Sequence, residues 1–119
     1  MNLSRKKLGN WGEQLAAEFL KRNNYVLLAQ NYRCQYGEID IIAREKDSIV
    51  FVEVKTRNSS NFGMGLEAVN YVKIQKIKKT AMAYLSEKPL KYNSLRFDVI
   101  DINLSNSSTP EIIHIKNAF

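Results

Sequence analysis

The sequence holds very little of the chemistry that small proteins use for covalent or metal cross-links. It has one cysteine, Cys34, and one histidine, His114, among 119 residues. A single thiol excludes an intramolecular disulfide framework and a multi-cysteine metal site, and it is typical of a reducing compartment. A lone histidine in a strand pattern is more often structural than catalytic. The sequence also contains no Ser-His-Asp order, no zinc-ligand spacing and no glycine-rich phosphate loop.

Long apolar runs are scarce as well. No stretch reaches the length of a membrane span, and the basic residues 5–7 are not followed by the apolar segment of a signal peptide. We therefore predict a cytoplasmic protein without a membrane partner. The formal charge of +6 favours a polyanionic partner, with nucleic acid ahead of an anionic surface.

The remaining composition, 45% hydrophobic and 25% charged, is that of one globular domain, expected over residues 1–119. Hydrophobic periodicity predicts the order α-β-β-β-α-β-β. The first helix should be capped by Ser4 and end near Arg22. The other expected elements are a strand at 25–32, two strands within 37–57, a helix over 74–85, a strand at 95–104 and an edge strand at 111–116. This order predicts an α/β fold with a mixed central sheet flanked by helices.

Residues 37–57, GEIDIIAREKDSIVFVEVKTR, are predicted to form a hairpin at the centre of the chain. A polar turn centred on residues 46–47 sets the register. Alternate residues of each strand then share one face of the hairpin, so that even-numbered residues of the first strand face odd-numbered residues of the second. The predicted pairs on that face are Ile42 with Phe51, Asp40 with Glu53, and Glu38 with Lys55.

The predicted hairpin places two carboxylates opposite each other. Asp40 and Glu53 would repel unless a proton or a cation offsets them, and Mg²⁺ suits such a pair because it also accepts waters and phosphate oxygens. Lys55 lies on the same face as a point charge suited to phosphate or an oxyanion. The alternative is a structural ladder of cross-strand ion pairs. The flanking apolar runs predict burial, and buried charges need partners or a metal.

Glu13 has two interpretations. If the first helix begins at Asn10, Glu13 is the partner at position N3 of a capping box; otherwise it is a further acidic ligand that reaches the hairpin. Gly9 and Gly12 each weaken the helix by about 1 kcal/mol relative to alanine. Their presence predicts that another backbone, or a nucleic-acid strand, approaches closely there.

The second helix carries four lysines without an interleaved acid, which favours contact with a phosphate backbone over a merely solvated face. These lysines are Lys73, Lys76, Lys78 and Lys79. The polar segment 58–65 precedes the helix, either as a loop that closes on a substrate or as a plain connector. In the strand at 95–104, Asp98 and Asp101 point to opposite faces, and one of them is expected to be a buried carboxylate paired with Arg96 or Arg33.

Together these motifs resemble the YraN-like family of small bacterial proteins. The segments that carry the resemblance are N-Y-R at 31–33, G-E-I-D-I-I-A at 37–43, F-V-E-V-K-T-R at 51–57, R-F-D-V at 96–99 and the closing N-A-F. The family belongs to the PD-(D/E)xK restriction-endonuclease-like superfamily and is similar to archaeal Holliday junction resolvases. The resemblance covers nearly the whole chain.

The resemblance implies roles for particular residues. Asp40 and Glu53 would hold a divalent metal, Mg²⁺ or Mn²⁺, and Lys55 would assist the attacking water. Glu13 would add to the metal site, and a polar residue of the following helix, Lys73 or Gln75, would support it. The backbone of the nucleic acid is expected to contact Arg57, Lys73, Lys76 and Lys79.

Two departures from the superfamily pattern are visible. Ile39 stands where the PD motif has proline, and Glu38 is an added acid without a clear counterpart, interpreted here as a supporting residue. The resulting hypothesis is a Mg²⁺-dependent endonuclease that acts on DNA, with branched DNA among its substrates. Symmetric cutting of a junction would need a two-fold homodimer. The rival hypotheses are a non-catalytic nucleic-acid-binding module and a protein-interaction domain with a structural charge ladder.

Overall fold

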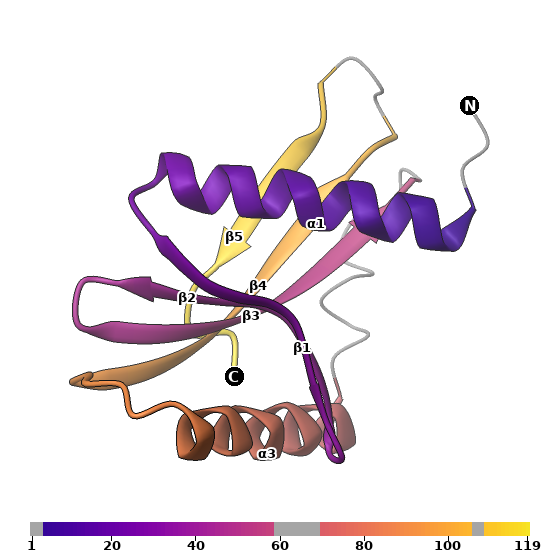
Figure 1. Ribbon diagram of the computed structural model, residues 1–119. Coiled ribbons are helices and arrows are strands. Elements are labelled where there is room, and N and C mark those ends of the chain that lie inside the picture. The colour runs from indigo at the N-terminus through magenta and orange to yellow at the C-terminus, as the bar shows by residue number, and fades with distance from the viewer. Residues whose placement is uncertain (1–3, 59–69, 106–108) are drawn as a thin grey trace.

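The computed structural model of the protein describes residues 4–58, 70–105 and 109–119. Their elements confirm the predicted order and the α/β class (Figure 1). The bounds are α1 (Arg5–Arg22), β1 (Val26–Cys34), β2 (Gly37–Glu45), β3 (Ser48–Arg57), α3 (Tyr71–Glu87), β4 (Ser94–Asn103) and β5 (Glu111–Ile115). Apart from its first residue, the segment 58–65 discussed as a loop lies outside the described residues. No helix within the described ranges is long and apolar enough to cross a membrane.

The five strands form one mixed sheet in the order β1-β2-β3-β4-β5. The first three strands make an antiparallel meander, β3 and β4 are parallel, and β5 returns antiparallel as an edge strand. A parallel pair needs a crossover, and α3 lies within it. Helix α1 crosses one face of the sheet and α3 the other, as Figure 1 shows. The predicted mixed sheet and edge strand are therefore confirmed.

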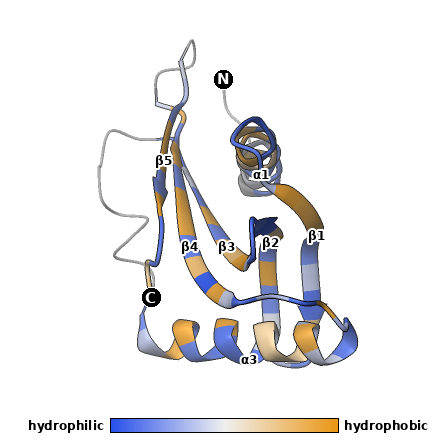
Figure 2. Cartoon of the chain, turned by 90° about the vertical axis from the view of Figure 1, so that its left-hand side faces the viewer, coloured by the Kyte–Doolittle hydropathy of each residue, from blue (hydrophilic) through white to orange (hydrophobic). Residues whose placement is uncertain are grey.

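The hydrophobic core has two parts, one on each face of the sheet. The part under α1 is built around Ala16 and Leu20, and the part over α3 around Ile77, Ala81 and Tyr84. Because both faces of the central strands are covered, β2 and β3 carry near-continuous apolar runs (Figure 2). The site described below therefore rests on strands that are anchored from both sides.

A buried charge network stabilises β4. The carboxylate of Asp98 is fully buried and accepts hydrogen bonds from Arg96, from His114 Nε2 at 2.7 Å and from the Asn117 amide at 3.1 Å. The structure thus confirms that His114 makes a structural contact and that Asp98 is the buried carboxylate that pairs with Arg96. Arg33, the other candidate partner of Asp98, instead pairs with Glu38 at 2.9 Å, on an exposed surface.

Helix α1 begins where predicted, because the side chain of Ser4 accepts a hydrogen bond from the Lys7 amide. Of its two glycines, only Gly12 meets a close neighbour. A methyl group on Gly12 would overlap the side chain of Thr56 in β3, whereas one on Gly9 would meet nothing within 4 Å. The close neighbour expected at Gly12 is thus the side chain of Thr56 in β3. At Gly9 the expectation is wrong, because none of the described residues approaches it closely.

The two glycines give a matched pair of variants. Gly12→Ala is expected to lower the free energy of unfolding by about 1–3 kcal/mol, because the added methyl forces α1 away from Thr56. Gly9→Ala is expected to raise it by up to about 1 kcal/mol, because alanine is the better helix former. Urea denaturation measures both values. Equal stability of the two variants would contradict the close packing of α1 on β3.

Candidate metal and nucleic-acid site

The site lies where β2 and β3 separate. The predicted pairing of Ile42 with Phe51 is confirmed, but the ladder between the strands ends one residue pair beyond it. At that point Asp40 Oδ2 accepts a hydrogen bond of 2.8 Å from the Val54 amide. A side chain of β2 thereby takes the place of a backbone acceptor. The predicted pairs that lie beyond the end of the ladder are Asp40 with Glu53 and Glu38 with Lys55.

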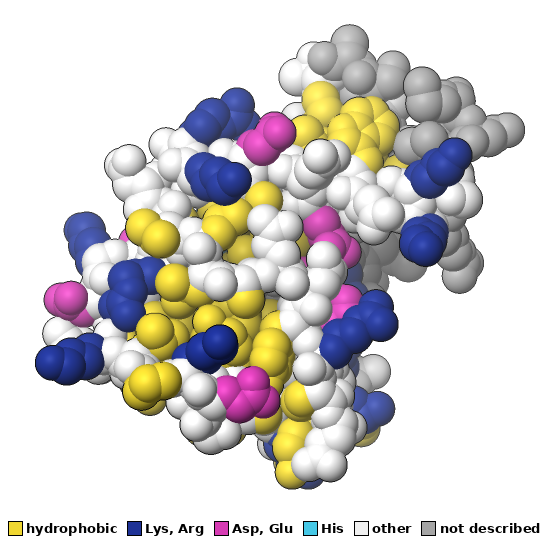
Figure 3. Space-filling model, in the orientation of Figure 1, with side chains coloured by type: hydrophobic (Ala, Val, Ile, Leu, Met, Phe, Trp, Pro, Cys, Tyr) yellow, Lys and Arg dark blue, Asp and Glu magenta, His cyan; other side chains and the backbone are white. Residues whose placement is uncertain are grey.

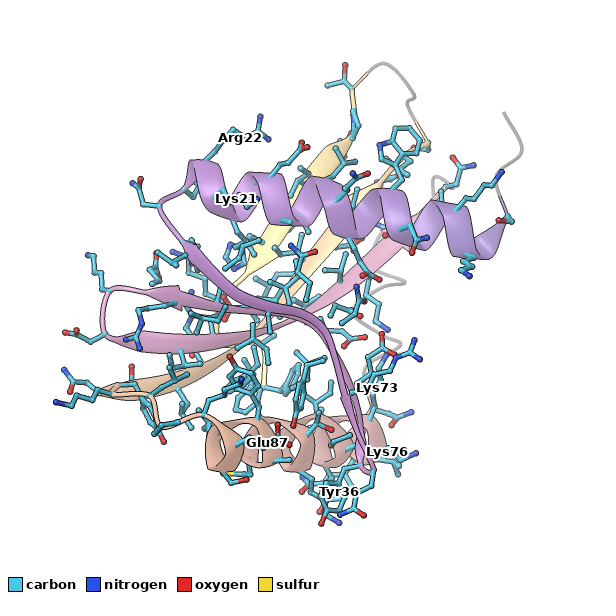
Figure 4. All side chains as sticks on the ribbon, in the orientation of Figure 1. Lys21, Arg22, Tyr36, Lys73, Lys76 and Glu87 are labelled. Atoms are coloured by element: carbon cyan, nitrogen blue, oxygen red, sulfur yellow. The ribbon has the colours of Figure 1, made fainter. Side chains whose placement is uncertain are left out.

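The opened strands and the start of α3 enclose a small cleft of about 290 Å³. Its lining residues come from three elements and include the predicted site residues Asp40, Glu53 and Lys73. They are Gly37, Glu38 and Asp40 of β2, Glu53 of β3, and Lys73, Lys76 and Ile77 of α3. Figure 4 shows Lys73 and Lys76 at the beginning of α3, and Figure 3 shows acidic side chains between the two helices beside basic ones.

Asp40 is the most perturbed acid of the cleft. Burial, and then the charge of Glu53, raise the pKa of Asp40 to about 7, although the hydrogen bond from Val54 opposes the rise. The charges of Glu13 and Glu38 act in the same direction as Glu53. None of the ion pairs in the described part of the chain includes Asp40. The cleft therefore holds negative charge that its basic residues do not fully neutralise.

Glu13 belongs to the same cluster of charge. Because α1 begins at Arg5, Glu13 lies in the middle of the helix and the capping-box interpretation is wrong. Burial and the charge of Glu38 raise the pKa of Glu13, a side-chain hydrogen bond with Asn31 lowers it, and Glu53 raises it further. Asn31 was not predicted as a residue of this cluster. Its position inside a strand pattern could have drawn attention to it, because asparagine tolerates the left-handed backbone that it adopts here, with φ 53°.

Two lysines contact the glutamate of the cleft. Lys73 Nζ lies 3.0 Å and Lys55 Nζ 3.4 Å from the same oxygen, Glu53 Oε1. Burial, and then the neighbouring Lys73, lower the pKa of Lys55. Lys55 thus stands beside the acids as predicted, with a proton that it holds less tightly than an ordinary lysine does.

The residues of the cleft fit an open metal site. In the described part of the chain, no three Asp, Glu, His or Cys side chains already form a ligand set. Mg²⁺ needs only one or two protein carboxylates, because it keeps several waters and binds phosphate oxygens. Asp40 and Glu53 supply such a pair, and the raised pKa of Asp40 marks the charge that a cation would offset. Glu13 as a third direct ligand stays a prediction.

The residues predicted to contact nucleic acid separate into two groups. Lys76 and Lys79 are exposed on α3, and Lys73 pairs with Glu53. The side chain of Arg57 is only 10% exposed and donates hydrogen bonds of 3.1 and 3.2 Å to Asp101, so its contact with nucleic acid stays a prediction. Gln75 lines another hollow than the cleft, and its supporting role likewise stays a prediction.

The fold and cleft define an α/β protein with an acidic, lysine-flanked site at an opened hairpin. Residues 12–102 match the model of the uncharacterised protein family UPF0102, and the chain belongs to that family. A UPF0102 protein of Clostridium acetobutylicum is 45% identical over 120 residues, covering 100% of this chain and 98% of its own. One from Caldanaerobacter subterraneus subsp. tengcongensis is 44% identical over 119 residues, with 98% of both chains covered. One from Geobacter metallireducens is 46% identical over 119 residues, covering 100% and 97%. The YraN-like resemblance is thus confirmed.

The pairing of Lys73 with Glu53 leads to a prediction about cation binding. An ammonium group 3.0 Å from a ligand oxygen competes with a metal for that oxygen. Lys73→Met is therefore expected to tighten Mn²⁺ binding by about three- to tenfold, measured by isothermal titration calorimetry. Lys21→Met, on the exposed surface of α1, is the matched control and should leave the affinity unchanged. Weaker Mn²⁺ binding by Lys73→Met would contradict the competition.

Proposed function

We propose that the protein is a metal-dependent endonuclease that acts on DNA, branched DNA included, and that the cleft between β2, β3 and α3 is its site. One observation carries the proposal. Asp40 is partly buried near Glu53 with its pKa raised to about 7, while two lysines lie beside the same glutamate. Two carboxylates that share a site repel each other and lower the stability of the fold unless a cation offsets their charge. Such a pair beside lysines is therefore more typical of a site for phosphate chemistry than of a structural contact. The resemblance to the PD-(D/E)xK superfamily supports the same interpretation.

In the proposed mechanism each residue has one task. Asp40 and Glu53 would hold Mg²⁺ or Mn²⁺, and the bound metal supplies an activated water and neutralises charge on the scissile phosphate. Lys55 would donate a hydrogen bond from Nζ that orients the attacking water or stabilises the negative charge on a phosphate oxygen. Val54 holds Asp40 in place through its amide.

Binding of the DNA backbone would fall to the exposed lysines of α3. Lys76 borders the cleft and Lys79 lies one turn further along the helix surface. Contacts of this kind are largely independent of base sequence and weaken as salt is raised. Arg57 is less available for this task, because its guanidinium already pairs with Asp101.

The test compares labelled single-stranded, duplex and four-way-junction DNA, incubated with Mg²⁺, with Mn²⁺ or with EDTA. Cleavage is expected only with metal, and it should vanish in the Asp40→Asn/Lys55→Ala variant. Glu18→Gln, an exposed carboxylate of α1, is the control and should cleave as the wild type does. Cleavage that persists in the double variant at the wild-type rate would overturn the assignment of the site.

One observation favours a second candidate, a nucleic-acid-binding module without catalysis. The carboxylate of Glu53 already pairs with the ammonium groups of two lysines, so its charge is partly offset without a metal. This candidate predicts DNA binding that survives EDTA and the Lys55→Ala change, with no product at any metal concentration. The structural charge ladder, by contrast, lacks support, since no ion pair of the described residues offsets Asp40.

A further inference from the structure

A second concave surface lies on the outward side of α3. It measures about 650 Å³ and is bounded on one side by the turn between β1 and β2. We call it the α3 groove. Its lining residues are Gln35, Tyr36, Gln75, Lys78, Lys79, Met82, Ala83 and Ser86.

The α3 groove combines positive charge with exposed apolar side chains. None of its lining residues, all within the described ranges, is acidic, and two are lysines. Tyr36 is 44% exposed and Met82 is 51% exposed. Tyr36 lies at the end of the β1–β2 turn, close to the beginning of α3 (Figure 4). A basic surface that presents an aromatic ring at its edge is the combination that binds unpaired nucleotides.

The α3 groove is connected with the cleft. A third hollow over the β1–β2 turn shares Gln35 and Tyr36 with the groove, and Gly37 and Glu38 with the cleft. The turn lies close to the helix: a methyl group on Gly37 would stand 3.3 Å from Thr80 Oγ1, and the φ of 152° at this residue favours glycine. A strand that leaves the cleft over this turn would therefore enter the groove beside α3.

We propose that the α3 groove binds a single-stranded nucleic-acid segment that extends from the cleft, with a base stacked on Tyr36 and phosphates beside Lys79. This inference rests on the proposed function, because it gives the substrate of the same site an unpaired portion. In a duplex the base faces are covered by their neighbours, so an exposed aromatic ring selects unpaired bases. From Gln75 to Ser86 the helix surface runs about 16 Å, room for on the order of four nucleotides.

Tyr36 and Lys79 give the proposal two separate readouts. Fluorescence anisotropy is measured in EDTA, with the Asp40→Asn/Lys55→Ala protein as background, on a twelve-nucleotide thymidine strand and on a twelve-base-pair duplex. Tyr36→Ala is expected to weaken binding of the single strand about tenfold and to change duplex binding less than twofold. Tyr36→Phe should keep the wild-type affinity, because the ring face remains. Lys79→Ala should weaken the binding of both the single strand and the duplex, and it should lower the slope of log affinity against log salt by about one. Lys78 is a poorer choice for this substitution, because its ammonium lies 6.0 Å from the centre of the Phe97 ring.

The controls separate this proposal from the nuclease proposal. Tyr92→Ala removes another exposed tyrosine, 41% exposed and outside the groove, and should change neither affinity. Equal effects of Tyr36→Ala and Tyr92→Ala, or equal losses for single strand and duplex, would overturn the groove. Tyr36-dependent binding without any cleavage by the wild type supports the groove and overturns the nuclease. Metal-dependent cleavage by the wild type, with no effect of Tyr36→Ala on binding, supports the nuclease and overturns the groove. Circular dichroism confirms that each variant is folded, and Tyr36→Leu repeats the test with a different apolar side chain.

Discussion

Asp40→Asn is expected to raise the melting temperature of the metal-free protein by about 10 °C at pH 8 and to change it little at pH 4. The wild-type carboxyl keeps its proton up to about pH 7 in the folded protein but loses it near its ordinary pKa of 3.8 when unfolded. Because the folded state then binds more protons than the unfolded state, wild-type stability falls as the pH rises from about 4 to about 7. The loss is on the order of 3 kcal/mol, and an asparagine, which does not ionise, avoids it.

Differential scanning calorimetry in EDTA at several pH values measures this effect as the difference between variant and wild type. The difference should grow between pH 4 and pH 7 and then stay constant. Glu18→Gln, an exposed acid of α1, is the control and should give a flat difference. With Mn²⁺ present the proposed function predicts the reverse order, because a metal that binds only the folded state would stabilise the wild type by mass action, whereas the variant would lack a proposed ligand. A flat difference for Asp40→Asn would contradict the uncompensated charge in the cleft.

Asp98→Asn is expected to act in the opposite direction and to lower the free energy of unfolding by about 3–5 kcal/mol. The substitution leaves the buried guanidinium of Arg96 without its main counter-charge and weakens the contact with His114. Burial alone would raise the pKa of Asp98, but hydrogen bonds from His114 and Arg96 lower it overall. The network therefore adds stability above the ordinary carboxyl pKa and loses it as the pH falls below that value.

Thermal denaturation from pH 3 to pH 8 checks the second prediction. The gap between wild type and Asp98→Asn should be widest at neutral pH and narrow in acid. Asp47→Asn, in the exposed β2–β3 turn, is the matched control and should change stability by less than about 0.5 kcal/mol. Asp98→Asn should also leave Mn²⁺ affinity unchanged, because its network does not contain the residues of the cleft. A loss below about 1 kcal/mol at pH 7 would show that the network is not needed for stability.

Local sequence pattern was enough to predict the elements and much of the sheet. The turn at residues 46–47 and the apolar runs beside it set the register that pairs Ile42 with Phe51. The symmetric register did not hold two residues further along, where Asp40 was expected to pair with Glu53. Symmetric extension of a hairpin takes no account of side chains that replace backbone hydrogen-bond acceptors. Asp40 does this at Val54, and only the tertiary structure reveals it.

The roles of Arg57 and Gln75 could not be predicted for a related reason. Arg57 lies two residues after the F-V-E-V-K motif, and nothing nearby in sequence indicates a partner for it. Its partner Asp101 comes from β4, which pairs with β3 in parallel only after the chain has crossed over through α3. Gln75 is two residues from Lys73, but on a helix that spacing turns a side chain away from its neighbour's face. Nearness in sequence to a motif was a poor guide to membership of the site.

The hydrogen bond from Val54 to Asp40 makes one backbone amide a spectroscopic reporter of the cleft. Its proton faces a carboxylate rather than a carbonyl, so its NMR chemical shift depends on the charge of that carboxylate. Titration of Asp40 near pH 7 moves this single resonance, while the amides of the confirmed β2–β3 ladder stay in place. The charge of Asp40 in the native protein can thus be followed at one peak, without a label, a substrate or a substitution.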